Sequence, residues 1–362
     1  MTLIAAQVIN GIPIILGDLL LTREQGGDDP NVNCIPTIKR ANEHLSPHGE
    51  MRVVGLSQKV NIVSRNVCIA WSGAKYQASA LIRHLREHWG EGEVSEEEFN
   101  ECLDGYPKEE INDIHVIAYL YDKGKKSFCF RDNIGGVPFE LDGLQNVQLA
   151  GSGSGAYLEV VEQYFTGSKA IGEATSLDKV LSKVMGFTSS VLGVQMMSGM
   201  GLLEGWGGGF EIAYIHGGRF EKLSEVLCLF WKAQQNESGD TSFSLFQRIV
   251  KTTYQNERLV LYVIDWMGEV SEESIFVVDP LFDIDKRAPI VIPDFNYKWI
   301  VNVFQVAAPD GSNSYMTRVD RPGSGKAPIR IEIMEDSFKM HFSDEYLKSL
   351  FGSDQAASVG GE

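Results

Sequence analysis

Residues 1–22 read MTLIAAQVINGIPIILGDLLLT. Two apolar runs, Leu3–Ile9 and Ile12–Leu16, flank Asn10-Gly11, a dipeptide typical of a two-residue β-hairpin turn. The pattern therefore predicts a buried first strand and an antiparallel return strand. Asp18 follows the return strand, where the hairpin would bring it back towards Thr2.

Thr2 is the first candidate for chemistry. Met1 precedes a residue small enough for routine removal of the initiator methionine, which would leave Thr2 with a free amine beside its hydroxyl. A threonine hydroxyl is a weak nucleophile until a base takes its proton, and an α-amino group titrating at roughly 8 can be that base. Thr2 would then carry both the nucleophile and the base.

Three blocks carry a family resemblance. They are Thr2 with Gly17-Asp18; KVNIVSRNVCIAWSGAKYQASALIRHL (59–85), which Lys59 opens; and LAGSGSGAYLEVVEQY (149–164). In this order they resemble the N-terminal nucleophile hydrolases of the proteasome β-subunit type, including the bacterial peptidase that pairs with an ATP-driven unfoldase. The resemblance covers about residues 1–220.

The resemblance implies roles for individual residues. Thr2 would be the nucleophile, Lys59 and Asp18 the charged pair that tunes it, and Ser152 a hydrogen-bonding support for the amine. Gly73 would supply the oxyanion donor, although it also fits an ordinary strand-to-helix turn. The implied pocket for the residue before the cut bond consists of Leu21, Ser57, Trp71 and Lys75, where the bulk of Trp71 favours small or medium apolar side chains.

One part of the family pattern is altered. Where many β-subunits place an Asp before a Ser-Gly pair, this chain offers by position Glu204 and Gly207. The role of that segment is therefore left open, although its glycines would allow close backbone approach to a substrate or a neighbouring subunit.

Composition excludes several classes of protein. The net charge is −17 over 362 residues, from 32 basic and 49 acidic side chains, which would repel nucleic acid and anionic membranes. No apolar run approaches the ~20 residues that a membrane-spanning helix needs. The five cysteines show no metal-ligand spacing and favour reduced thiols in the cytoplasm.

Other stretches offer weaker signals for a bound group. His44 and His48 lie in a predicted irregular insertion, 23–50, whose Pro47 interrupts any helix that would align them. His84 and His88 lie four apart on a predicted helix but lack the HExxH arrangement of a zinc site. The GSGSG turn (151–155) lacks the features of a nucleotide-binding loop. We therefore expect no metal and no cofactor.

The order of predicted elements indicates the fold class. Strands at 59–63, 66–71, 114–121, 126–131 and 146–150 alternate with helices at 74–88, 95–103, 155–166 and 176–193, and a hairpin turns at Gly217-Gly218. This order favours an α+β fold, an αββα four-layer sandwich, for a hydrolase-like unit at 1–223. Residues 224–351 read as a β-rich extension with one helical piece near 243–256, and the tail 352–362 is predicted to be disordered.

The function expected from these features is a threonine-type hydrolase that cleaves peptide or protein substrates through an acyl-enzyme on Thr2. Two alternatives stay open: a non-catalytic scaffold subunit, and a hydrolase of the same type that acts on small amides. Family members assemble into rings or stacks, so self-association into a homo-oligomer is expected. An ATP-dependent unfoldase partner is left open.

Overall fold

The computed structural model describes most of the chain, in separate stretches: 2–24, 32, 34–39, 41–45, 51–125, 127–133, 139–141, 144–166, 176–198, 201–235, 241–267, 270–284, 288–292, 295–307, 313–323, 327–333 and 338–351. Met1, His48 and the tail 352–362, for which the sequence made predictions, lie outside these residues, as does the side chain of His44. No helix in the described stretches is long and apolar enough to cross a membrane.

The N-terminal hairpin forms as predicted. Strand β1 (Ile4–Ile9) returns as β2 (Ile12–Asp18), and the two pair in antiparallel register. Asn10 and Gly11 both adopt positive φ angles, 50° and 74°. A type I′ turn requires this conformation at both central residues, which explains why an Asn-Gly step occupies the turn.

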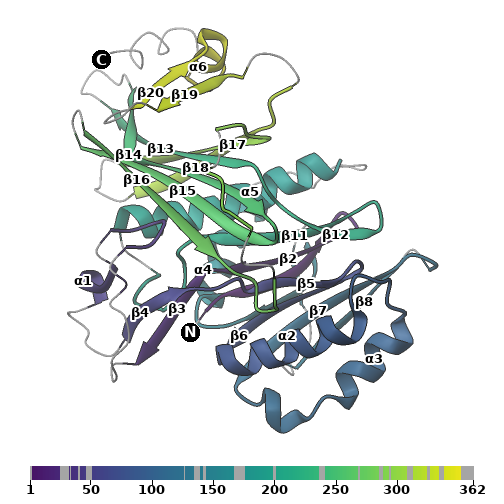
Figure 1. The fold of residues 1–362 in the computed structure, drawn as a ribbon. Helices are drawn as coiled ribbons and strands as arrows, with labels where there is room; N and C mark the ends of the chain where they lie inside the picture. The colour runs from purple at the N-terminus through teal and green to yellow at the C-terminus, as the bar shows by residue number, and fades with distance from the viewer. Residues whose placement is uncertain are drawn as a thin grey trace.

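Two sheets pack face to face, and the hairpin lies in the middle of the first one (Figure 1). The first has the strand order β12-β11-β2-β1-β10-β9, which adds β9 (Phe139–Leu141), β10 (Leu144–Ala150), β11 (Phe210–His216) and β12 (Arg219–Lys222). The second has the order β5-β6-β7-β8, from β5 (Val60–Ser64), β6 (Val67–Gly73), β7 (Ile114–Asp122) and β8 (Ser127–Asp132). An apolar core that includes Ile4, Ile15, Val60 and Ala70 joins them, so the starts of β1 and β5 and the end of β2 lie close together.

Helices cover the other face of the second sheet. Helix α2 (Lys75–Trp89) buries Ala78, Leu81, Ile82 and Leu85, the apolar face predicted from their spacing. Helix α3 (Glu96–Gly105) begins at a capping box, in which Ser95 and Glu98 each bond the other's backbone amide. A short 3₁₀ turn, η2 (Lys108–Ile111), leads back to β7.

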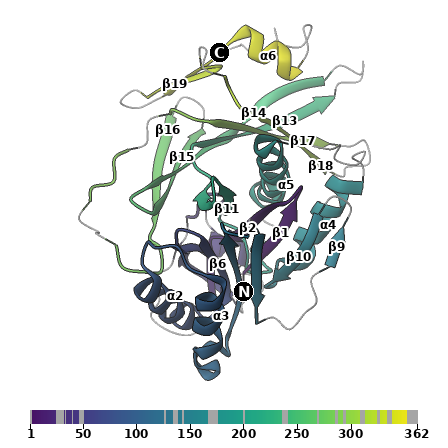
Figure 2. The same cartoon turned by 90° about the vertical axis from the view of Figure 1, so that its right-hand side faces the viewer.

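A third sheet follows in the chain and covers helix α5. Its order is β16-β15-β14-β13-β17-β18, from β13 (Val226–Gln235), β14 (Thr241–Gln255), β15 (Arg258–Met267), β16 (Val270–Val278), β17 (Trp299–Ala307) and β18 (Asn313–Asp320). Helices α4 (Ser154–Thr166) and α5 (Leu177–Ser198) pack on the first sheet, and α5 also packs against β17 and β18. Figure 2 shows α5 between this sheet and the strands β1 and β2.

Smaller elements complete the described chain. Strand β3 (Leu20–Glu24) pairs with β4 (Met51–Leu56), and the short helix α1 (Ala41–Leu45) lies inside the predicted insertion. Near the C-terminus β19 (Ile329–Ile333), β20 (Phe338–Phe342) and α6 (Asp344–Phe351) form a cap over the third sheet.

The predicted αββα four-layer sandwich is wrong for this chain. The described chain is mostly strand and is divided among five separate sheets, nearly all of whose strand pairs are antiparallel. The physical reason lies at α5, whose two faces are both buried against sheets, so it is an interior element instead of part of an outer helical layer. The division of the chain at residue 224 stays a prediction.

The predicted helical piece near 243–256 is also wrong, because these residues belong to β14. Ile249, Val250 and Thr252 are β-branched, and β14 pairs on both sides, with β13 and β15. Neighbouring strands therefore decide a conformation that local apolar spacing left ambiguous. Residues 289–292 of the segment PIVIP lie outside any strand, with Val291 and Ile292 exposed.

Candidate active site

The structure brings Thr2, Asp18 and Lys59 together. The Thr2 hydroxyl donates a short hydrogen bond to Oδ1 of Asp18 and accepts one from Nζ of Lys59 at 2.7 Å. All three side chains are buried, with at most 1% of each residue exposed. The hydroxyl therefore lies between a carboxylate and an amine in a site shielded from bulk water.

The Asp18 carboxylate accepts hydrogen bonds from three backbone amides. Its Oδ1 accepts from Leu3 N at 3.0 Å, and its Oδ2 accepts from Leu20 N at 3.2 Å and from Gly207 N at 2.8 Å. Burial raises the pKa of Asp18, while the nearby charge of Lys59 and these hydrogen bonds oppose that rise. The carboxylate is thus anchored in one position against the Thr2 hydroxyl.

Lys59 immediately precedes β5 and reaches the hydroxyl over the face of Trp71, with Nζ 4.7 Å from the ring centroid. Gly17 leaves room for it, because a Cβ at that position would lie 2.7 Å from the Lys59 Cβ. Burial lowers the pKa of Lys59; the charges of Asp18 and Glu211 oppose this shift, and that of Lys75 adds to it.

Burial acts in opposite directions on the pKa values of the two groups beside the Thr2 hydroxyl. The pKa of the acid rises and the pKa of the amine falls, both because burial penalises the charged forms. The proton affinities of the two groups therefore move towards each other across the Thr2 hydroxyl. An amine with a lowered pKa in direct contact with a hydroxyl is suited to accept its proton.

The glycine turn after β10 holds the backbone of Thr2. Gly153 N donates to the Thr2 carbonyl at 3.2 Å, and Gly151, at φ 95°, lies so close that a Cβ would be 2.0 Å from the same oxygen. Ser152 is exposed, and its hydroxyl donates to the backbone carbonyl of Glu204. The support of the Thr2 amine by Ser152 stays a prediction.

Gly73 lies at the end of β6 with φ 102°. Its Cβ would come within 2.1 Å of the Asp113 carbonyl, so close backbone approach alone requires a glycine there. The predicted oxyanion role is an additional proposal and is not needed to explain the residue.

The predicted pocket residues differ in their exposure. Trp71 is fully buried, donates from Nε1 to the Gln58 carbonyl at 3.0 Å and shares an apolar cluster with Leu21. The Ser57 hydroxyl is buried without a hydrogen-bond partner among the described residues. Lys75 is exposed at the start of α2, and it lines a cavity of about 340 Å³ with the segment 277–283.

Two residues near the site have roles that sequence reasoning did not assign. Gly207, noted only by its position, donates directly to Asp18. Glu211 is buried in β11, and its Oε2 accepts from Lys59 N at 2.6 Å. The one available signal was a glutamate within an otherwise apolar strand, FEIAYIH, because buried carboxylates need partners.

The histidines form no metal site in the described part of the chain, where no group of three or more metal-ligating side chains is found. His84 stacks on His88 with ring centroids 6.2 Å apart, and its Nε2 lies 4.0 Å from Sγ of Cys102.

The chain matches no protein-family model, and a search of curated proteins finds no relative.

Proposed function

We propose that the protein is a hydrolase of the N-terminal nucleophile type that cleaves an amide bond with Thr2. One observation carries the proposal: the Thr2 hydroxyl is held between the Asp18 carboxylate and the Lys59 amine. The proposal requires that Thr2 has a free α-amine in the active protein.

The proposed reaction begins when the Thr2 oxygen attacks the amide carbonyl carbon. When the Thr2 hydroxyl turns its proton from Asp18 to the uncharged amine of Lys59, the proton passes to Lys59 and, through the α-amine of Thr2, to the departing nitrogen as the C–N bond breaks. Water then adds to the ester on Thr2 and releases the acid, which restores the hydroxyl. Asp18 holds Thr2 in place and stabilises the positive charge that Lys59 gains with the proton.

The substrate of the proposed reaction is a peptide, and a small amide is the alternative substrate. The scaffold alternative gains no comparable support, because a structural subunit does not need a buried Thr-Asp-Lys set.

The wider setting belongs to the same proposal. We infer self-association, because β16 is the edge strand of the third sheet and exposes Ile275 and Val277. An unfoldase partner would be needed only if the substrate is a folded protein. All five cysteines are unpaired, which supports a reducing compartment such as the cytoplasm.

The test combines mass spectrometry with a covalent probe. The intact protein should begin at Thr2, and a β-lactone should add one acyl group there. Thr2→Ala should not react, Thr2→Ser should retain reaction, and Lys59→Met should react roughly 10²-fold or more slowly. Labelling that persists in Thr2→Ala, or a blocked Thr2 amine in an active protein, would overturn the proposal. Competition by peptides and by small amides then separates the two substrate classes.

A further inference from the structure

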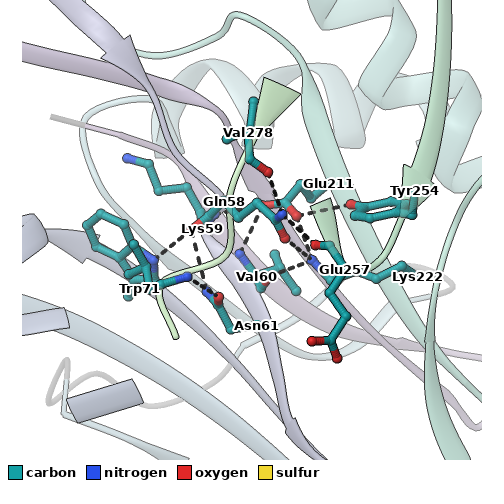
Figure 3. A network of polar contacts seen from close by, with 11 residues as sticks. Gln58, Lys59, Val60, Asn61, Trp71, Glu211, Lys222, Tyr254, Glu257 and Val278 are labelled. Carbon is teal, nitrogen blue, oxygen red and sulfur yellow. Dashed lines mark hydrogen bonds and ion pairs between the residues drawn. The ribbon is translucent and has the colours of Figure 1, made fainter. Parts of the chain in front are cut away.

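We propose that Glu211 is a positioning residue for Lys59, and that it ties the catalytic amine to the third sheet through Tyr254. This inference rests on the proposed function for its catalytic meaning. The geometry that carries it is a buried polar network between β5, β11, β12 and β14 (Figure 3).

Glu211 crosses from the first sheet to the second. It pairs with Gly17 in the strand register, and side chains of paired residues point to the same face of a sheet. Because Gly17 has no side chain, the carboxylate can reach the start of β5. There Oε2 accepts from the backbone amides of Lys59 at 2.6 Å and Val60 at 3.2 Å.

The other carboxylate oxygen faces two further donors. Oε1 accepts from Lys222 Nζ at 2.5 Å and from the Tyr254 hydroxyl at 3.0 Å. Glu211 is the acceptor in all four hydrogen bonds, as an ionised carboxylate must be. Lys222 also donates to the Val60 carbonyl, so the ion pair is itself attached to β5.

A second link runs through the residue before Lys59. The Gln58 amide donates to the carbonyls of Glu257 at 2.8 Å and Val278 at 2.7 Å, both in the third sheet or its turn. Lys59 is thus bracketed by two contacts that lead to the third sheet, Gln58 to its backbone and Glu211 to Tyr254. This arrangement fixes the backbone from which the Lys59 side chain extends to Thr2.

Loss of this support has an electrostatic consequence as well as a geometric one. The titratable groups that act on Lys59 are Asp18 from β2, Glu211 from β11 and Lys75 from α2. Replacing Glu211 by glutamine removes one negative charge that favours protonated Lys59. The pH at which Lys59 loses its proton should therefore fall, whereas a structural defect that admits water to Lys59 would raise it.

The experiment compares Glu211→Gln and Tyr254→Phe with a matched pair, Glu273→Gln and Tyr262→Phe. Tyr262 also donates to a carboxylate, that of Glu273, within the third sheet. The rate of β-lactone addition to Thr2 is measured against pH in protein whose folding is verified by thermal unfolding. Glu211→Gln should react roughly 10- to 100-fold more slowly than wild type. In this variant the pH below which the labelling rate falls should be lower than in wild type. The matched pair should behave as wild type.

A second readout is independent of catalysis. Hydrogen exchange at the Lys59 and Val60 amides should accelerate in Glu211→Gln and, to a smaller extent, in Tyr254→Phe. If Glu211→Gln does not fold, Tyr254→Phe decides, because it leaves the carboxylate in place. Folded variants with wild-type rates, pH profile and exchange would overturn the positioning role. If wild type does not label at Thr2 but hydrogen exchange still accelerates in the variants, the proposed function is refuted and the positioning role is retained.

Discussion

The Thr2 hydroxyl is buried together with two ionisable side chains. A carboxylate and an amine approach the same oxygen, and both are withdrawn from water. Each charged form is penalised by burial and favoured by its partner. The same physics acts on other buried groups of this chain, where it predicts effects on stability.

Two buried thiols should make the protein sensitive to alkali. Burial raises the pKa of Cys68 and of Cys228 to about 12, from the ordinary 9.0. Above pH 9 the unfolded chain releases these protons while the folded chain keeps them, so the stability that the buried thiols contribute below pH 9 is lost as pH rises from 9 to 12. The loss should reach about 1 kcal/mol per thiol between pH 9 and pH 10.

Urea unfolding at these two pH values checks this prediction. The double variant Cys68→Ala/Cys228→Ala should be less stable at pH 8, because it leaves cavities, but should lose less stability than wild type from pH 9 to pH 10. Equal losses in the two proteins would show that the thiols ionise alike in the folded and unfolded states.

Among the elements, β2 and β5 meet where the site is built. Gly17 is the residue of β2 that faces Lys59, and its role is to be small. Gly17→Ala should displace the start of β5, cost about 1–3 kcal/mol of stability and reduce the rate of Thr2 labelling more than stability alone explains. Labelling at 10 °C, where the variant is still folded, separates the two effects.

Gly155→Ala is the control for this prediction. Gly155 lies in the first turn of α4, and a Cβ there meets nothing within 4 Å. Its replacement should leave labelling unchanged and stabilise the protein by roughly 0.5–1 kcal/mol. A wild-type labelling rate in Gly17→Ala would show that β5 can shift without disturbing Lys59.

Across the whole molecule, the third sheet completes the core on which the site is built. One apolar cluster contains Phe187 and Val191 of α5 together with Phe230, Leu261 and Val303 of the third sheet. We expect a chain that ends at residue 223 to expose this face of α5. It should be insoluble or bind a hydrophobic dye such as ANS, with loss of near-UV circular dichroism.

A chain that ends at Phe351 is the matched control, because it retains every described element. It should be soluble, unfold cooperatively and label at Thr2 as wild type does. A soluble, cooperatively folding 1–223 chain would instead show that the N-terminal part is an independent unit, and the predicted division at residue 224 would then be correct.

Local signals in the sequence determined the elements that depend on few neighbours. Asn10-Gly11 predicts its turn because both residues adopt positive φ readily, and the spacing of Ala78, Leu81, Ile82 and Leu85 predicts α2 because one face must be apolar. The Met-Thr start, the hairpin and the family resemblance together indicate Thr2, Asp18 and Lys59, and these three residues lie in contact.

Tertiary contacts decided the rest, because they join residues that no local pattern connects. Strand β14 is a strand because β13 and β15 flank it, and α5 is an interior helix because the third sheet covers it. Glu211 accepts a hydrogen bond from the backbone amide of Lys59, which lies 152 residues away along the chain, so sequence spacing does not predict the contact. The sequence alone thus determined the hairpin and the candidate nucleophile, whereas only the packing of three sheets decided what supports Lys59.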